Sequence, residues 1–250
     1  MPGAAISSRR EVKIGILVVA YEAETTLESV LNRIPQTFRA SIHTILVCDD
    51  ASTDDTYQVG MRVKESRPDL PLQVLRRPVN LGYGGNQKAG YRWMIDNGLD
   101  VVVLLHGDGQ YAPEFLPQMV APILEGGADV VFGSRMLERG AALRGGMPKY
   151  KFVGNKILTF LQNRLAGVRL SEWHSGYRAY SISSLAGVGF ELNADYYDFD
   201  TQIILQMIAS RQRIVEIPIP TFYGDELSRV NGVRYGWRIL RHTLRWRLTR

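Results

Sequence analysis

LLHGDGQYAPE, residues 104–114, follows the aliphatic run Val101–Leu105 and presents His106, Asp108 and Gln110 among glycines. A short apolar run bounded by turn residues is typical of a buried strand, and glycine lets the backbone beyond it approach a ligand closely. In open parallel sheets, ligands bind beyond the carboxyl ends of the strands. The stretch therefore predicts a buried strand that carries candidate ligand-binding groups at its carboxyl end.

Apolar runs alternate with amphipathic stretches along the first half of the chain, which predicts an α/β fold with a mostly parallel sheet flanked by helices. Strands are expected at 12–20, 42–48, 72–75, 101–105 and 129–133, and helices at 25–34, 54–65, 85–97 and 113–124. Helices at 150–165 and 200–209 and a strand at 213–221 are expected to complete the fold. The polar clusters YEAE, DDASTDD, NLGYGG and HGDGQ all follow predicted strands, so we expect them to meet at one edge.

The composition over 250 residues, 45% hydrophobic and 22% charged, favours a globular chain and excludes intrinsic disorder. The apolar runs fall far short of the roughly 20 residues that a membrane-spanning helix needs. The N-terminus lacks the apolar core of a secretory signal, and the single cysteine, Cys48, cannot form an intrachain disulfide. We therefore expect a cytoplasmic protein with one domain over residues 10–228.

Two pairs of polar residues are candidates for ligand binding. Asp108 and Gln110 offer oxygen atoms to one cation, and Mg²⁺ needs only one or two carboxylates when phosphates and water complete its shell. A turn in which Asp108 caps the helix expected near Pro113 explains the motif equally well. Asp49 and Asp50 point to opposite faces of their strand, so at least one requires a partner: a nucleotide base or ribose, or an internal arginine.

NLGYGGNQKAG, residues 80–90, matches the first part of the dinucleotide fingerprint G-x-G-x-x-G through Gly82 and Gly84. However, Gln87 occupies the position of the last glycine, and the cluster follows the third predicted strand instead of the first. This disfavours a nicotinamide-dependent oxidoreductase. A turn that opens a helix is the safer interpretation.

Taken in order, these motifs resemble those of the family 2 glycosyltransferases of the GT-A (Rossmann-like) fold, and within them the dolichol-phosphate mannose or glucose synthase group. The resemblance covers roughly residues 14–229. VVAYEAE resembles the first-strand signature P-A-Y-N-E, VCDDASTDDT the motif V-D-D-G-S-T-D-G-T, and HGDGQYAPE the motif D-x-D-L-Q-x-P-P-E. NLGYGGNQKAG matches the glycine-rich third motif, and FGSR, HSGYR and YGDELSR are similar to G-S-R, S-G-F-R and R-x-x-G-x-S-K. Each motif alone is modest, but their order and spacing together are specific.

The resemblance implies a metal-dependent, inverting transfer of a sugar from a UDP- or GDP-sugar, with Mg²⁺ or Mn²⁺ as cofactor. It implies a polyprenyl phosphate or a cell-surface glycan precursor as the acceptor. The residues implied to bind the donor nucleotide are Val19, Ala20, Tyr21, Glu22, Asp50, Asn80, Gly107 and Asp108. The implied metal ligands are His106, Asp108 and Gln110. The implied catalytic residues are Asp108, Arg135 and Arg178, and the implied acceptor or phosphate contacts are Arg135, Ser228 and Arg229.

The chain also departs from the family pattern at three positions: Val19 replaces a proline, Ala23 replaces an acid, and His106 occupies the first position of the D-x-D pair. Because imidazole suits Mn²⁺ better than Mg²⁺, His106 predicts that Mn²⁺ supports activity at least as well as Mg²⁺. The departures leave open a noncatalytic glycosyltransferase-like subunit that binds a nucleotide sugar or a partner protein. If the acceptor is a hydroxyl group, Asp198 and Asp200 are candidate general bases, with a helix N-terminus as the alternative explanation.

Residues 229–250 differ in charge from the rest of the chain. Seven arginines lie from Arg229 to Arg250 with no acid after Glu226, whereas residues 1–228 carry a net charge of −2. An apolar stripe at helical spacing predicts a basic amphipathic helix; it consists of Val233, Trp237, Leu240, Leu244 and Leu248. Such a helix can lie on anionic lipid at the cytoplasmic membrane face, pack on its own domain, or meet another subunit or a membrane protein. Nucleic-acid binding is not expected, since the body of the chain lacks a basic face and any recognised module.

Overall fold

The computed structural model describes residues 11–220 and 232–249. These residues form one seven-stranded sheet in the order β3-β2-β1-β4-β6-β5-β7. All neighbouring pairs are parallel except those of β6, which runs antiparallel between β4 and β5. The strands are β1 Ile14–Ala20, β2 Ile42–Asp49, β3 Leu72–Arg76, β4 Val101–His106, β5 Val130–Ser134, β6 Arg178–Ser181 and β7 Ile214–Pro218. The predicted mostly parallel α/β sheet is confirmed.

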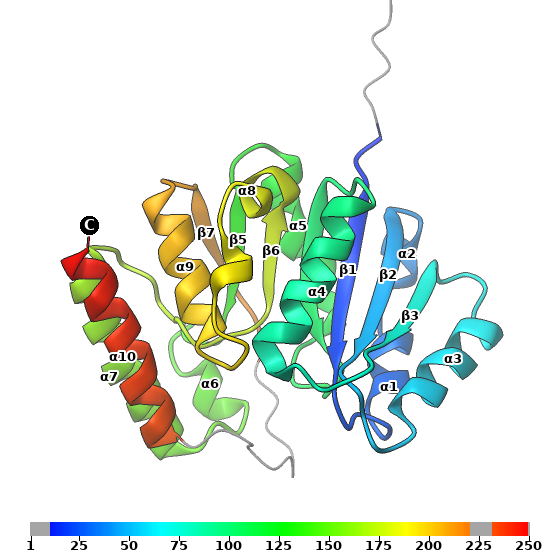
Figure 1. Cartoon of the computed structure of the whole chain (residues 1–250), viewed down its shortest axis with the longest axis horizontal. Coiled ribbons are helices and arrows are strands. Elements are labelled where there is room, and N and C mark those ends of the chain that lie inside the picture. Colours follow the sequence, from blue (N-terminus) through cyan, green and yellow to red (C-terminus); the bar gives the residue numbers. More distant parts are fainter. Residues whose placement is uncertain (1–10, 221–231, 250) are drawn as a thin grey trace, which may run out of the picture.

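Helices cover both faces of the sheet (Figure 1). The longer ones in the first half are α1 Leu27–Asn32, α3 Thr56–Ser66, α4 Gly82–Asp96 and α5 Leu116–Leu124. The second half contains α7 Lys149–Ala166, α8 Ile182–Ala186, α9 Phe199–Ala209 and α10 Gly232–Leu248. The remaining short elements are α2 Gln36–Arg39, α6 Ala141–Arg144, and the 3₁₀ turns η1 Pro113–Phe115 and η2 Phe190–Leu192.

The side chains of β1 alternate between two hydrophobic cores, as the period of two in a strand requires. Ile16 and Val18 pack with residues of α1, α3 and α5, whereas Leu17 and Val19 pack with residues of α4, α8 and α9. Because the strand is buried on both faces, its sequence is a nearly continuous apolar run. This double coverage leaves the strand ends as the places where the sheet can present polar groups to a ligand.

The strand β6 was not predicted, because its sequence lies within the polar and aromatic cluster SEWHSGYRAY. It is only four residues long and begins at Arg178, so it shows no alternation of its own. Pairing fixes it instead: Leu104 of β4 and Phe132 of β5 both lie opposite Arg178. A strand stabilised by two neighbours needs little intrinsic propensity.

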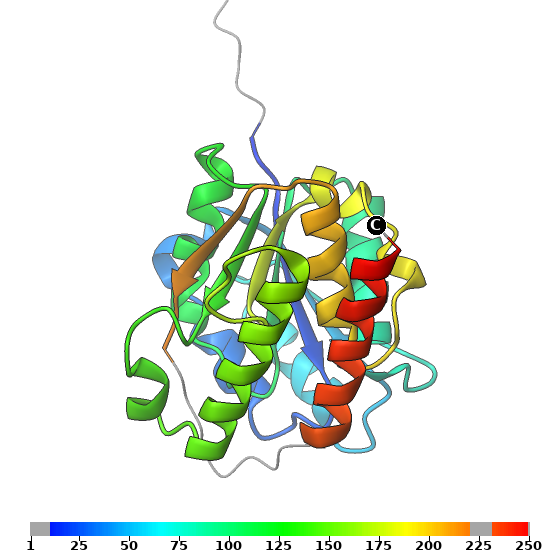
Figure 2. The same ribbon diagram turned by 90° about the vertical axis from the view of Figure 1, so that its left-hand side faces the viewer.

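Helix α10 lies beside α7 at one end of the molecule and also contacts α9 (Figures 1 and 2). Its buried positions are Gly236, Ile239 and Thr243. The predicted apolar stripe lies on another face, where Trp237 is 66% exposed. Asp198, at the start of α9, anchors α10 through two of its residues: a hydrogen bond of 2.9 Å joins it to His242 Nε2, and an ion pair of 3.1 Å joins it to Arg238. The amphipathic helix is present and packs on the domain, as one alternative predicted, but it does so through the face of Gly236, Ile239 and Thr243 and not through the predicted stripe.

Candidate active site

The carboxyl ends of β1, β2 and β4 meet at one edge of the sheet. The register places Ala20 beside Asp49 and Val19 beside His106. The loops beyond the strands are joined in the same way, since the N–H of Gly107 donates to the Val19 carbonyl at 2.9 Å. The convergence expected from the sequence is therefore observed for the clusters that follow these three strands.

The two adjacent aspartates at the end of β2 are both held by protein groups. Asp50 accepts hydrogen bonds from the backbone N–H groups of Leu81 and Gly82, each at 2.9 Å, and so ties the loop before α4 to β2. Asp49 Oδ1 accepts hydrogen bonds from the backbone N–H and the hydroxyl of Ser52, and Asp49 Oδ2 lies 3.6 Å from Arg76 Nε. Burial raises the pKa of Asp50 even though these two hydrogen bonds oppose the shift. Of the partners considered for the pair, Asp49 has an arginine, which is exposed and not internal, and Asp50 has backbone amides; contact of Asp50 with a nucleotide stays a prediction.

The loop after β1 lies against the loop after β2. Glu22 has a left-handed backbone with φ of 49°, which is uncommon for a residue other than glycine, and its N–H donates to Ser52 Oγ at 2.9 Å. Tyr21 is exposed beside it. Nearby, Asn80 accepts a hydrogen bond from the N–H of Gly82 at 2.9 Å. The structure thus gathers the residues expected to bind the nucleotide at this edge, and one strained turn positions the exposed tyrosine.

One carboxylate oxygen of Asp108 accepts a hydrogen bond within its own loop, and the other lies near His106. Oδ1 accepts the backbone N–H of Gln110 at 3.0 Å, and Oδ2 lies 4.0 Å from His106 Nδ1. The helical cap considered as an alternative is not formed: Ala112 is the N-cap residue of η1, without a side-chain cap bond. Burial lowers the pKa of His106 to about 4 against the opposing charge of Asp200, so the ring is neutral at pH 7.

A divalent ion fits between His106 Nδ1 and Asp108 Oδ2. Their separation of 4.0 Å is larger than the roughly 3.0 Å between neighbouring ligands of an octahedral ion with bonds of about 2.1 Å, so a small rotation of the side chains would bring both atoms onto one ion. A mixed nitrogen and oxygen donor set suits Mn²⁺ or a similar transition metal better than Mg²⁺. Within residues 11–220 and 232–249, no three or more His, Cys, Asp or Glu side chains gather as a metal site. Oxygen atoms of phosphate or water would complete the coordination of an ion held by these two side chains.

Arg135 lies at the end of β5 in a buried ion pair with Glu172. Its Nε donates to Glu172 Oε1 at 3.0 Å, its backbone N–H donates to Oε2 at 2.8 Å, and its Nη2 donates to the His174 carbonyl at 3.1 Å. Burial alone would raise the pKa of Glu172, but the charge and hydrogen bonds of Arg135 hold it below its usual range. The pair fixes the loop around His174, and contact of Arg135 with a phosphate stays a prediction.

Arg178 is 1% exposed, and all three of its guanidinium nitrogens have protein partners. Nη1 lies 3.1 Å from Asp200 Oδ1, while Nε and Nη2 donate to the carbonyls of Ser175 and Trp173 at 3.0 and 3.3 Å. This interior position does not favour the direct phosphate contact that the motif implied. Arg178 instead holds Asp200, and both candidate general bases, Asp198 and Asp200, are buried in ion pairs.

Tyr83 and Tyr111 contact His106 and were not singled out in the sequence. Tyr83 Oη lies 3.1 Å from His106 Nε2 and donates to Asp200 Oδ2 at 3.0 Å. The ring of Tyr111 meets the His106 ring edge-on at 4.9 Å, and its hydroxyl accepts the N–H of Gly176 at 2.7 Å. The signal available for Tyr83 was an aromatic residue at the start of a helix that begins at the ligand-binding edge.

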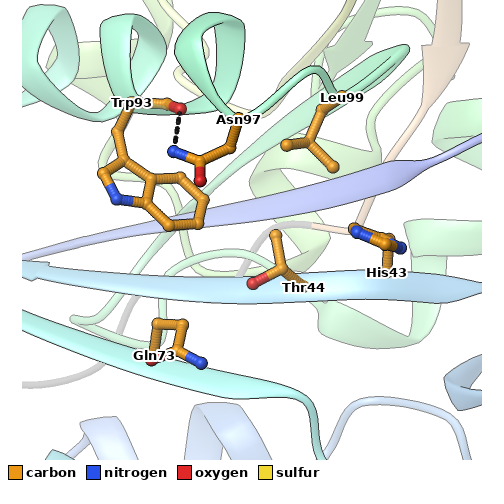
Figure 3. A pocket seen from close by; sticks show the side chains of 6 residues that line it. All are labelled: His43, Thr44, Gln73, Trp93, Asn97 and Leu99. Carbon is orange, nitrogen blue, oxygen red and sulfur yellow. Dashed lines mark hydrogen bonds between the residues drawn. The ribbon is translucent and has the colours of Figure 1, made fainter.

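A hollow of about 280 Å³ lies at the opposite edge of the sheet, near the start of β2 and the end of α4 (Figure 3). Its side chains come from β2, β3, α4 and the loop after α4, and the one hydrogen bond drawn among them joins Asn97 to the Trp93 carbonyl. The lining residues are His43, Thr44, Gln73, Trp93, Asn97 and Leu99. Since this hollow contains no carboxylate and no arginine or lysine, the strand-end cluster is the better candidate. Ser228 and Arg229, also predicted site residues, lie outside the described part of the chain.

Comparison with known families decides the identity of this site. The family model described as Glycosyl transferase family 2 matches residues 16–188, which include most of β1, all of β2 to β6 and the loops that follow β1, β2 and β4. The chain belongs to glycosyl transferase family 2. It is accordingly a glycosyltransferase that uses a nucleotide-sugar donor, as the ordered motifs had predicted.

Two relatives within the family are similar over most of their length. An undecaprenyl-phosphate mannosyltransferase of Micrococcus luteus is 32% identical over 208 residues, which is 82% of this chain and 82% of that protein. A UDP-N-acetylglucosamine–dolichyl-phosphate N-acetylglucosaminyltransferase of Methanococcus voltae is 26% identical over 237 residues, 90% of this chain and 92% of that protein.

The fold of this glycosyltransferase is shared with a solved structure. Glucosyl-3-phosphoglycerate synthase from Mycobacterium tuberculosis, in complex with Mn²⁺ and UDP-glucose, superposes with a TM-score of 0.68 at 21% identity, covering 99% of this chain and 84% of that one. The same enzyme with Mg²⁺ and UDP superposes equally well. At this identity the likeness establishes the GT-A fold alone.

Proposed function

We propose that this glycosyltransferase transfers a sugar from a UDP- or GDP-sugar to a polyprenyl phosphate, with inversion at the anomeric carbon and with a divalent cation. The observation that carries the proposal is the similarity, over more than four fifths of the chain, to two enzymes whose names specify polyprenyl-phosphate acceptors. Two different sugars occur in those names, so the relatives support the class of acceptor and leave the sugar open.

The strand-end cluster suits such a transfer. Loss of the nucleoside diphosphate leaves negative charge on its phosphates, and a divalent ion held at His106 and Asp108 stabilises this charge when bound. A phosphate acceptor is already anionic and needs no general base. This agrees with the burial of Asp198 and Asp200 in ion pairs, where neither is placed to take a proton from a hydroxyl acceptor.

A transfer assay tests this proposal. The purified chain is given labelled UDP- and GDP-sugars, a short polyprenyl phosphate and either Mn²⁺ or Mg²⁺, and formation of the lipid-linked sugar is measured. Asp108→Asn is expected to reduce the rate about 100-fold, the order of magnitude found when a group that stabilises developing charge is removed. Asp96→Asn is the matched control, because Asp96 is exposed at the far end of α4.

Three outcomes would contradict parts of the proposal. Equal activity of Asp108→Asn and the wild type would remove the metal role of this residue. Activity with Mg²⁺ but none with Mn²⁺ would remove the preference expected from the imidazole ligand. Tight nucleotide-sugar binding without turnover, with every acceptor tried, would favour the noncatalytic subunit instead.

We also propose that α7 and α10 bring this site to an anionic membrane. In the described part of the chain no helix has both the length and the apolar character to cross a bilayer. The two helices lie side by side (Figure 2), and both carry exposed apolar side chains. These are Tyr150, Val153, Ile157, Phe160 and Leu161 of α7 and Val233, Trp237, Leu244 and Leu248 of α10, and together they are called the α7/α10 surface.

The charge of the two helices favours lipid headgroups over a neutral partner. Neither α7 nor α10 contains an acidic residue. Their exposed basic residues are Lys149, Lys156, Arg164, Arg234, Arg241, Arg245 and Arg247. Exposed apolar side chains on a helix that also carries exposed basic residues are typical of helices that lie in the headgroup region of an anionic bilayer.

Vesicle cosedimentation tests the membrane contact. The wild type is expected to sediment with vesicles that contain anionic lipid, less so at high salt, and to stay in solution with neutral vesicles. The double variant Phe160→Glu/Trp237→Glu is expected to lose this binding. Leu192→Glu changes a side chain that is 90% exposed on η2, away from the α7/α10 surface, and is expected to bind as the wild type does. A wild type that ignores anionic vesicles would contradict the proposal and favour a protein partner for this surface.

A further inference from the structure

The ring of His106 is held by a chain of hydrogen bonds that reaches into the core. His106 Nε2 lies 3.1 Å from Tyr83 Oη, Tyr83 Oη lies 3.0 Å from Asp200 Oδ2, and Asp200 Oδ1 lies 3.1 Å from Arg178 Nη1. Gln87 Nε2 also donates a hydrogen bond to Asp200 Oδ1 at 3.3 Å and helps to hold Asp200 in position. The four residues of the chain come from four different elements: His106 from β4, Tyr83 from α4, Asp200 from α9 and Arg178 from β6.

Counting protons along this chain determines which nitrogen of His106 carries hydrogen. The carboxylate of Asp200, paired with Arg178, can only accept hydrogen bonds, so the single hydrogen of the Tyr83 hydroxyl is directed to it. The Tyr83 oxygen is then an acceptor toward His106, and Nε2 must be the donor. A neutral imidazole has one N–H, so Nδ1 keeps its lone pair.

The surroundings of the ring exclude the flipped orientation. Rotation of the ring by 180° would place a carbon atom against Tyr83 Oη and leave the tyrosine oxygen without its donor. The ring is confined by Tyr111, which meets it edge-on, and by Gly176, where a Cβ atom would lie 2.6 Å from the ring. In the observed orientation Nδ1 faces Asp108 Oδ2 at 4.0 Å.

We propose that Tyr83, Asp200 and Arg178 are positioning residues that hold His106 as the Nε2–H tautomer and direct its Nδ1 lone pair toward Asp108. Nδ1 and Asp108 Oδ2 then form a nitrogen and oxygen pair for one divalent ion, and the hydrogen-bonded chain behind it does what a carboxylate or carbonyl does behind many metal-binding histidines. This inference rests on the proposed metal-dependent function, and it assigns a reason for the histidine at a position where the family pattern has an acid.

The first test observes the tautomer directly, without metal or substrate. The chain has four histidines, so the ring nitrogens can be resolved by ¹⁵N NMR, with His106→Gln assigning the signals of His106. We expect a protonated Nε2 and an unprotonated Nδ1 in the wild type at pH 7.5, and a mixture of tautomers in Tyr83→Phe. A wild type with hydrogen on Nδ1 would overturn the proposal, whether or not the variant folds.

The second test measures Mn²⁺ binding by electron paramagnetic resonance in the presence of UDP or GDP. Tyr83→Phe is expected to weaken Mn²⁺ binding about 10-fold, the lower end of the effect of removing a group that orients a metal ligand. Tyr150→Phe, which removes the hydroxyl of a tyrosine exposed on α7, is the matched control and is expected to bind as the wild type does. Asp200→Asn serves as a second variant if Tyr83→Phe does not fold.

The same titration gives a metal-selectivity readout. His106→Asp is expected to lower the ratio of Mn²⁺ to Mg²⁺ affinity at least 10-fold, because two carboxylates favour the harder ion. An unchanged ratio, or unchanged Mn²⁺ affinity in Tyr83→Phe, would overturn the proposal. Neither measurement needs an acceptor, so the absence of sugar transfer in a protein with the expected tautomer and Mn²⁺ affinity would contradict the proposed function alone.

Discussion

Replacement of Gly176 by alanine should disturb the strand-end site although it replaces no candidate ligand. An added Cβ would lie 2.6 Å from Cε1 and Nε2 of His106 and 2.8 Å from Tyr83 Oη. Carbon atoms in van der Waals contact lie about 3.5–4.0 Å apart, so at least one of these groups has to move by about 1 Å. The backbone of Gly176 lies outside the left-handed region, so the effect comes from this contact and not from φ.

The ring of His106 has little room to move away from the added Cβ. The ring of Tyr111 packs against His106, and the Tyr111 hydroxyl accepts the N–H of Gly176 at 2.7 Å, so these groups hold one another in place. Overpacking of this kind costs about 1–3 kcal/mol of stability. Because a shift of His106 also changes its distance from Asp108, we expect Mn²⁺ affinity to fall about 10-fold or more.

Urea unfolding and Mn²⁺ titration measure the two effects. Gly154→Ala is the control: it lies within α7, where an added Cβ meets nothing within 4 Å, and alanine in a helix is expected to stabilise by up to about 1 kcal/mol. If Gly176→Ala unfolds at the same urea concentration as the wild type and binds Mn²⁺ equally well, then the close packing around His106 is not what positions it.

Two further substitutions test buried charges. Glu172→Gln is expected to destabilise the fold by about 3 kcal/mol, because it leaves the Arg135 charge uncompensated and turns an amide group toward N–H donors. The control is Glu138→Gln, which breaks an exposed ion pair with Arg144 and should cost less than about 1 kcal/mol. Equal losses in urea unfolding would contradict this reading. His174 has its pKa lowered by burial from 6.5 to about 4, so the unfolded state takes up its proton first as the pH falls and stability is lost between about pH 6.5 and 4. From pH 7 to pH 5 the wild type should therefore lose about 2 kcal/mol more than His174→Gln, and parallel losses would show that the ring titrates normally.

The chain of hydrogen bonds behind His106 shows why part of the site escapes prediction. His106, Asp108 and the glycines around them are adjacent in sequence and follow an apolar strand, so the local pattern marks them. Tyr83 lies 23 positions before His106 in the sequence and 117 positions before Asp200. Their contact depends on where α4 and α9 pack against the sheet, and no periodicity within either segment records that.

Arg135 and Arg178 give the opposite lesson. The family motifs implied a catalytic role for both residues and a phosphate contact for Arg135; the structure adds that Arg135 pairs with Glu172 and that Arg178 pairs with Asp200 in the interior. A guanidinium group has the same appearance in a sequence whether it faces a ligand or a buried carboxylate. The difference is decided by the acid that the fold brings to it.

The sequence by itself determined the alternation of strands and helices, the family, and the edge at which polar groups gather, because these follow from periods of two and 3.6 and from residues next to one another. Only the tertiary structure decided the antiparallel place of β6 and the direction of the stripe on α10. Gly236 of α10 lies against Leu158 of α7, and the face that carries Gly236, Ile239 and Thr243 is buried, whereas the larger apolar face, with Trp237, remains outside. A helix has several faces that could be buried, and the shape of the neighbouring surface selects one of them.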